Sequence, residues 1–101
     1  PFSEGLAAVK KDDKWGFVNT EGKMVISADY DAARSFNEGF AVVKEKDDFG
    51  YINKEGKALG KIKYDQAKNF QDGKGFVKKK KDWGYLDKTG KEFFGRMNDQ
   101  F

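Results

Sequence analysis

The sequence predicts an all-β fold built as a tandem repeat of three 34-residue units, each a β-hairpin extended to three strands. The motif Phe-x-Glu/Asp-Gly occurs at residues 2–5, 36–39 and 70–73, always at the same spacing. Apolar residues gather in short runs between polar turns, which is the spacing of strands. Each copy also carries recurring glycines, which would interrupt the helices of a tetratricopeptide hairpin of the same period.

The copies align without a gap at about 2–35, 36–69 and 70–101, within a single repeat domain spanning residues 1–101. Because the chain begins at Pro1 without a methionine, we expect the domain to be excised from a longer protein. The recurring positions that we expect to be structural are Trp15, Gly16, Gly22, Tyr30, Phe36, Gly39, Phe49, Gly50, Gly56, Tyr64, Phe70, Gly73, Trp83, Gly84 and Gly90.

In the first copy, the first strand is expected at about residues 6–11, followed by a turn at 12–14. The second strand runs to about residue 19. Residues 19–22 place Asn first and Gly fourth, which suits a type I turn followed by a left-handed glycine. A third strand, at about 23–27, is then expected to pair back on the second.

The segment from Tyr30 to Phe36 is poor in strand-forming residues. We therefore expect Asp31 to cap one short helical turn there, with Tyr30 and Phe36 as apolar anchors at its ends. The recurring Phe2, Phe36 and Phe70 are expected to fill the core of each unit. The glycine three residues after each of them is expected to turn the chain into the next first strand.

The Trp-Gly pairs have two interpretations. An exposed ring could form a platform on which sugars or bases stack. We favour the structural interpretation, because large rings tend to be buried and a neighbouring glycine leaves room for an adjoining unit to approach closely.

The motifs of all three copies together resemble the bacterial WG repeat. The matching pattern is Gly-Leu-Ala-x-Val-Lys, Lys-Trp-Gly-Phe-Val-Asn-x-x-Gly-Lys, Tyr-Asp-x-Ala and Phe-x-Glu-Gly, in the order of that family. The departures are Phe49 for Trp, Lys74 for an apolar residue, and Asn98 for Tyr. The resemblance implies tandem β-hairpin units with an interaction or scaffolding role, and it transfers no catalytic residues.

The repeat pattern is compatible with an open array or with a closed, propeller-like ring. A ring of three units would be small for a propeller. Stacked units need contact only their neighbours. We therefore expect an open, solenoid-like array.

The residue types present argue against an enzyme. The sequence has neither histidine nor cysteine. The acidic pairs at 12–13 and 47–48 fall in predicted turns, where Asp is favoured for its own backbone hydrogen bonding. No stretch has the alternating oxygen ligands of a calcium loop. We expect no catalytic site, no metal site and no cofactor.

Charge differs between the copies and rises along the chain. The first copy has five basic and six acidic residues, the second seven and six, and the third eight and five. The excess lies in Lys78, Lys79, Lys80 and Lys81, a possible binding patch beside Trp83. Phosphate-binding surfaces usually concentrate more positive charge, so we do not expect nucleic acid as the partner.

We therefore expect a non-catalytic module for protein–protein interaction or scaffolding. The alternative is a cell-envelope or glycan-binding module that uses its aromatic and lysine side chains. No apolar run is long enough to insert into a membrane. The sequence favours neither the cell envelope nor the cytoplasm, and it predicts no particular oligomeric state.

Overall fold

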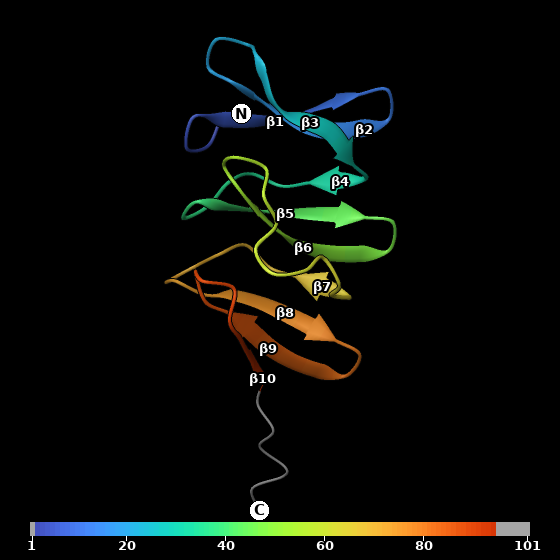
Figure 1. Ribbon diagram of the computed structural model, residues 1–101, viewed down its shortest axis with the longest axis vertical. Helices are drawn as coiled ribbons and strands as arrows, with labels where there is room; N and C mark the ends of the chain where they lie inside the picture. The colour runs from blue at the N-terminus through green and yellow to red at the C-terminus, as the bar shows by residue number, and fades with distance from the viewer. Residues whose placement is uncertain (1, 95–101) are drawn as a thin grey trace, which may run out of the picture.

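The computed structural model describes residues 2–94 as three antiparallel β-sheets stacked one after another (Figure 1). In this part of the chain there is no helix, and no strand of the first sheet pairs with a strand of the last. Strands β1 and β10 lie at opposite ends of the stack. The predictions of an all-β fold and of an open array are both confirmed.

Each sheet is built around a hairpin of two long strands. The first sheet has the order β1-β2-β3, with β1 at Leu6–Lys11, β2 at Lys14–Asn19 and β3 at Met24–Tyr30. The second has the order β4-β5-β6, with β4 at Ala32–Ala33, β5 at Phe40–Glu45 and β6 at Asp48–Asn53. The third has the order β10-β9-β8-β7, with β7 at Gln66–Ala67, β8 at Gly75–Lys79, β9 at Asp82–Leu86 and β10 at Glu92–Phe94.

The turn after each hairpin is held by the side chain that opens it. The Oδ1 atom of Asn19 accepts hydrogen bonds from the backbone N–H groups of Glu21 at 2.9 Å and Lys23 at 3.0 Å. Gly22 follows with a φ of +79°, the left-handed conformation that glycine adopts without steric cost. Asn53 makes the same pair of bonds in the second copy. The predicted turn is therefore present.

The helical turn predicted after Asp31 is wrong. The chain there forms β4, which pairs with β5 of the following copy, with Ala32 opposite Lys44. The Asp31 carboxylate accepts a hydrogen bond at 2.6 Å from the backbone N–H of Lys46, in the turn of the next hairpin. Pairing with the adjacent sheet satisfies the backbone of this segment, so it has no need of a local helix.

The third strand of the second copy is shorter than predicted. Two isolated bridges, Phe49 with Tyr64 and Ile52 with Ala58, stand where the first copy has all of β3. Gly60 occupies the position that Ile26 has in the first copy, and its φ is +71°. Glycine has neither the side-chain packing nor the backbone preference of a strand interior, and the extended pairing ends here.

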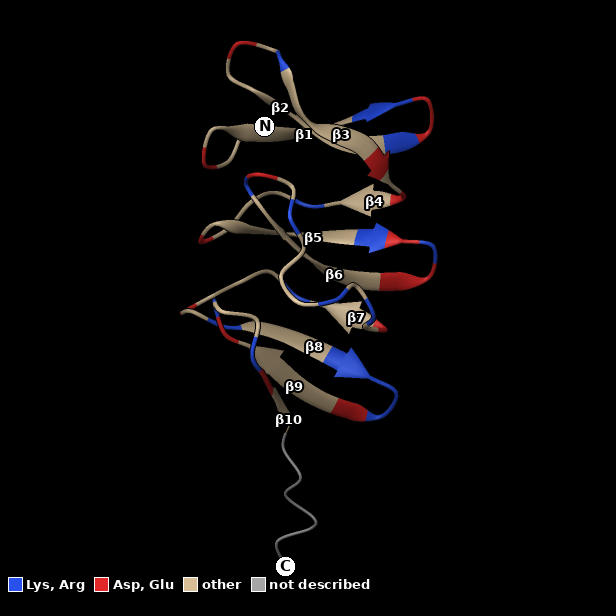
Figure 2. Ribbon diagram, in the orientation of Figure 1, with Lys and Arg blue, Asp and Glu red and all other residues tan. Residues whose placement is uncertain are grey.

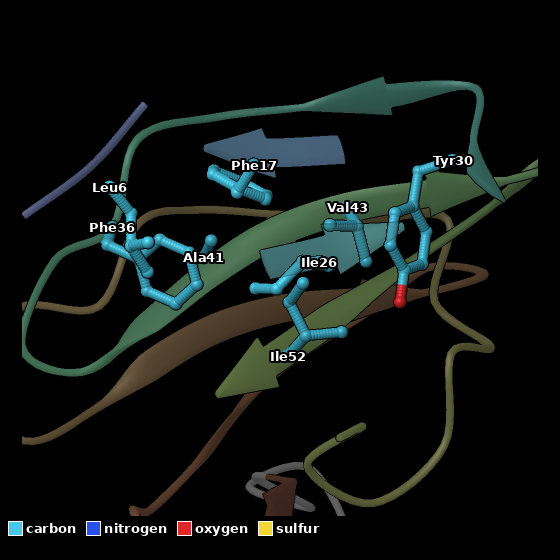
Figure 3. Packing of buried hydrophobic residues seen from close by; sticks show 8 residues of the cluster. All are labelled: Leu6, Phe17, Ile26, Tyr30, Phe36, Ala41, Val43 and Ile52. Atoms are coloured by element: carbon cyan, nitrogen blue, oxygen red, sulfur yellow. The ribbon is translucent and has the colours of Figure 1, made fainter. Parts of the chain in front are cut away.

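The apolar cores lie between copies. Figure 3 shows one cluster, to which the first copy and the second each contribute four residues. Its buried members are Leu6, Phe17, Ile26, Tyr30, Phe36, Ala41, Val43 and Ile52. A second cluster joins the second and third copies in the same way, through Val42, Tyr51, Tyr64, Ala67, Phe70, Val77 and Leu86. Each unit therefore depends on its neighbour for a closed core.

The glycine of each Trp-Gly pair permits a close approach, but not by the element that we predicted. A Cβ on Gly16 would collide with the backbone of Ile26 and Ala28 in β3 of the same copy. A Cβ on Gly50 would lie 2.7 Å from the Cα of Ile62, again in the same copy. The glycine thus makes room for the third segment of its own unit rather than for the adjoining unit.

Candidate functional site

The rings of the three Trp-Gly positions differ in burial. Trp15 and Phe49 are half-buried and pack against the edges of the two cores. The side chain of Trp83 is 42% exposed. The expectation that this ring is a core residue in every copy therefore fails in the third copy.

The core rings are instead those that follow each Trp-Gly pair. Phe17 and Tyr51 are fully buried, and each meets the phenylalanine of the next copy's Phe-x-Glu/Asp-Gly motif. The centroids of Phe17 and Phe36 are 4.8 Å apart, and those of Tyr51 and Phe70 are 4.9 Å apart. The sequence carries a signal for these rings, since an aromatic residue recurs at this position in all three copies. Tyr30, Tyr64, Phe36 and Phe70 are buried as well. The expectation that Phe2 fills the core of the first unit is wrong, because its side chain is 52% exposed.

The last sheet leaves an aromatic surface open at the end of the stack. We call Phe76, Trp83, Tyr85 and Phe93 the downstream end face. The Tyr85 ring lies 5.8 Å from Phe76 and 4.9 Å from Phe93, measured between centroids. Phe76 is 42% exposed and Phe93 is 37% exposed. These rings, with Gly84 and Phe94, line a shallow hollow of about 350 Å³.

Lysine ammonium groups flank this aromatic surface. The Nζ atom of Lys68 lies 5.1 Å from the centroid of the Trp83 ring, and that of Lys74 lies 5.4 Å from Tyr85. Lys91 is placed similarly over Phe93, at 5.3 Å. At such distances a cation is attracted by the face of an aromatic ring. The downstream end face thus combines apolar rings with positive charge.

The run of four lysines does not form one continuous patch. Lys78 is half-buried, with its ammonium 6.0 Å from the Trp83 ring. Lys79 donates a hydrogen bond from Nζ to the backbone oxygen of Lys63 at 2.8 Å. Lys80 and Lys81 form the hairpin turn after β8, at the edge of the stack where all three hairpin turns lie (Figure 2). The structure therefore places the four lysines of the predicted patch in three different surroundings.

Acidic side chains connect successive copies. The Glu4 carboxylate accepts a hydrogen bond from the backbone N–H of Gly39 at 2.9 Å. Glu38 accepts two such bonds, from Gly73 at 2.8 Å and Asp72 at 2.7 Å. These donations favour the charged form and lower the pKa of the Glu38 carboxyl. The glutamate of the Phe-x-Glu/Asp-Gly motif is therefore a contact between units.

The aspartates of the Tyr-Asp pairs make a second type of connection. The pKa of Asp31 is lowered, first by a hydrogen bond from the Lys14 ammonium at 2.5 Å and then by the backbone N–H of Lys46. Asp65 repeats the backbone contact by accepting a hydrogen bond from Lys80 N–H at 2.6 Å. Both aspartates are exposed, so the contact serves mainly to align one hairpin with the next.

Another hollow, lined in part by Lys63, Tyr64 and Glu92, lies between the second and third copies. The hydroxyl of Tyr64 donates a hydrogen bond to the Glu92 carboxylate, which also pairs with Lys63 Nζ at 3.0 Å. Burial raises the pKa of Tyr64, and the two donors lower the pKa of Glu92. A neutral tyrosine and an ionised, paired carboxylate provide neither a nucleophile nor a general base poised near neutral pH.

Within residues 2–94, no group of three or more acidic side chains lies close enough together to hold a metal ion. No helix in this range could span a membrane.

Comparison with known proteins identifies the family of the chain but no individual similar protein. The family described as the WG containing repeat matches three segments of the chain, at residues 1–15, 15–48 and 49–81. The two longer matches begin at Trp15 and at Phe49, the positions of the Trp-Gly motif. No curated protein and no solved structure matches the chain.

Proposed function

The chain belongs to the WG containing repeat family, and we propose that it is a non-catalytic module that binds a protein partner or acts as a scaffold. The observation that carries the proposal is the downstream end face, where Phe76 and Phe93 are exposed on either side of Tyr85. Contiguous exposed aromatic surface on a soluble domain usually marks an interaction site. Aromatic residues are also enriched among those that contribute most to protein binding.

The lysines define the chemistry of the expected partner. Lys68, Lys74 and Lys91 lie over the rings of this face, so a partner that combines apolar side chains with carboxylates would complement it. Nucleic acid is not the partner that we propose. Lys79 is engaged with a backbone carbonyl oxygen and Lys80 lies in a hairpin turn, so these two lysines do not track a phosphate backbone together.

A glycan-binding role is the second candidate, and the exposed ring of Trp83 favours it. Sugars stack on exposed aromatic rings. The ammonium groups of Lys68 and Lys78 compete for this ring, at 5.1 and 6.0 Å from its centroid, and for that reason we rank the protein partner first. Trp83→Ala would abolish glycan binding, and a glycan array would show whether there is any binding to lose.

The protein-binding proposal is tested with two matched variants. Phe76→Glu with Phe93→Glu places charge on the downstream end face, and Met24→Glu with Val25→Glu places the same charge on exposed apolar positions of the first sheet. Each protein is immobilised, and retained proteins from a bacterial extract are identified by mass spectrometry. We expect wild type and the first-sheet control to retain the same proteins and the end-face variant to lose them. Equal retention by all three would contradict the proposal.

A further inference from the structure

We propose that the downstream end face binds the opposite end of a second copy of this chain, so that molecules stack head to tail. This inference rests on the proposed function of that face as a protein-binding surface. It names the partner from the way in which the copies already bind one another within the chain.

The two junctions between copies within the chain show which contacts each end of the stack could make. At both, a buried ring that follows the Trp-Gly position meets an incoming phenylalanine edge to face, with interplanar angles of 69° for Phe17–Phe36 and 81° for Tyr51–Phe70. At both, a glutamate of one copy accepts a hydrogen bond from the glycine N–H of the next copy's motif. The same two contacts, repeated, make the same interface.

The downstream end face carries one half of such a junction. Tyr85 stands 34 residues after Tyr51, and Phe76 stands 34 residues after Val42, which is fully buried at the second junction. Asp72 occupies the position of Glu38, with a φ of +54° against +52°. These three residues thus repeat part of the surface that receives the next copy at each internal junction. Lys74 stands where Leu6 and Phe40 contribute apolar surface at those junctions.

The other end of the stack carries the complementary half. Phe2 occupies the position of Phe36 in the repeat, and its side chain is 52% exposed. Val9 and Val18 are half-buried, although their equivalents in the second copy, Val43 and Ile52, are fully buried. We call Phe2, Val9 and Val18 the upstream end face. It is the surface that the second and third copies insert into the preceding copy.

Charge favours this orientation over its alternatives. The first copy has an excess of acidic residues and the third an excess of basic ones. The contrast is visible at the hairpin turns, with Asp12-Asp13 in the first copy and Lys80-Lys81 in the third (Figure 2). Opposite ends therefore attract, whereas like ends repel. Because the two surfaces differ, repeated contact of this type builds an open chain of molecules rather than a closed dimer.

The area of the two end faces limits the affinity that we expect between molecules. A fully buried aromatic side chain covers about 150–250 Å². The four rings of the downstream end face and Phe2 with its two valines therefore form an interface no larger than the lower limit of about 1,200 Å² for stable complexes. The association should accordingly be weak and depend on concentration.

The test compares the 101-residue chain with variants blocked at one end. Phe2→Ser with Val9→Lys blocks the upstream end face, and Phe76→Glu with Phe93→Glu blocks the downstream one. Sedimentation velocity is measured from about 10 μM to about 1 mM, at low salt and at about 0.5 M salt, where charge attraction is screened. Circular dichroism checks that each variant keeps its strand content.

We expect the weight-average mass of wild type to rise past that of two chains at the highest concentration, and to fall at high salt. Each blocked variant alone should remain a monomer. An equimolar mixture of the two should form a one-to-one complex and stop there, since only one intact pair of ends remains.

A wild type that stays monomeric at 1 mM would overturn the proposal, and so would a mixture of folded variants that does not associate. If wild type is monomeric but the downstream variant still loses the proteins retained from the extract, the proposed function stands and only the identity of the partner is wrong.

Discussion

Phe2 and Phe36 occupy the same position in two copies of one motif, yet their surroundings are opposite. Both precede a two-residue turn with reciprocal backbone hydrogen bonds, at 2.8 and 3.1 Å between Ser3 and Leu6 and at 2.8 and 3.0 Å between Asn37 and Phe40. Phe2 is 52% exposed and Phe36 is completely buried. The turn is therefore a local property of the motif, whereas burial of the ring requires a preceding copy.

Burial also depends on a neighbouring copy at the other end of the stack. Tyr51 is fully buried, and its hydroxyl donates to the backbone oxygen of Lys68, 17 residues later in the chain. Burial raises the pKa of this tyrosine. Tyr85, its equivalent in the third copy, is only half-buried. What distinguishes the two tyrosines is whether another copy packs on their sheet.

The largest effect should come from removing the ring at an internal junction. Phe36→Ala would leave a cavity in the core shared by the first two copies, and large-to-small changes of this type destabilise by about 3–5 kcal/mol. Phe2→Ala should change the free energy of unfolding by less than about 0.5 kcal/mol, as at other exposed positions. Urea denaturation of a dilute sample, followed by tryptophan fluorescence, measures both. Equal losses would show that the first ring is packed as tightly as the second.

A smaller loss of stability is expected from substituting either of two glycines in the first copy. Gly16→Ala would drive a Cβ into the backbone of β3, which cannot yield without separating the strands, so we expect a loss of about 2–3 kcal/mol. Gly22→Ala meets nothing within 4 Å but must hold a φ of +79°, for a loss of about 1–2 kcal/mol. Gly22→Val should exceed 1 kcal/mol for the same reason.

Thermal unfolding of Gly16→Ala and Gly22→Ala would rank these two costs. A Gly16→Ala variant as stable as wild type would contradict the close packing of β2 on β3. A neutral Gly22→Ala would contradict the left-handed turn alone.

The smallest effect that we predict is a change in the pH dependence of the melting temperature. The pKa of Glu38 is lower in the folded chain than the ordinary value of 4.5, because two backbone N–H groups donate to its carboxylate. The unfolded chain therefore binds the proton more readily, so this contribution to stability is present above about pH 5 and is lost as the pH falls through the folded pKa. The melting temperature of Glu38→Gln should accordingly fall less than that of wild type between pH 6 and pH 3. Parallel curves would show that the contact between the second and third copies contributes nothing measurable.

Local sequence predicted the hairpins well because their signals are local. An Asn with a Gly three residues later dictates the turn at Asn19, and short apolar runs between polar turns mark the strands. The predicted helical turn at Asp31 failed for the opposite reason. Its backbone partners belong to β5, and nothing within the segment itself indicates that a sheet edge lies beside it.

The candidate site, too, was predicted only in part from the sequence. The repeat places an aromatic residue at Phe17, Tyr51 and Tyr85, which is sufficient to identify a structurally important position. It does not distinguish the two rings that are buried from the one that is open at the end of the stack. Likewise, four consecutive lysines indicate a charged patch, but successive strand residues point to opposite faces and the last two lie in a turn.

By itself, the sequence determined the period, the all-β class and the conformation of the turn after each hairpin, because these depend on side chains and φ preferences within a few residues. Only the tertiary structure decided that β4 and β7 join the following sheet, that the cores lie between copies, and that Phe76, Trp83 and Phe93 remain exposed. The reason is that burial belongs to pairs of units. Identical motifs favour identical local conformations. The burial of their side chains differs according to whether another copy is stacked against them.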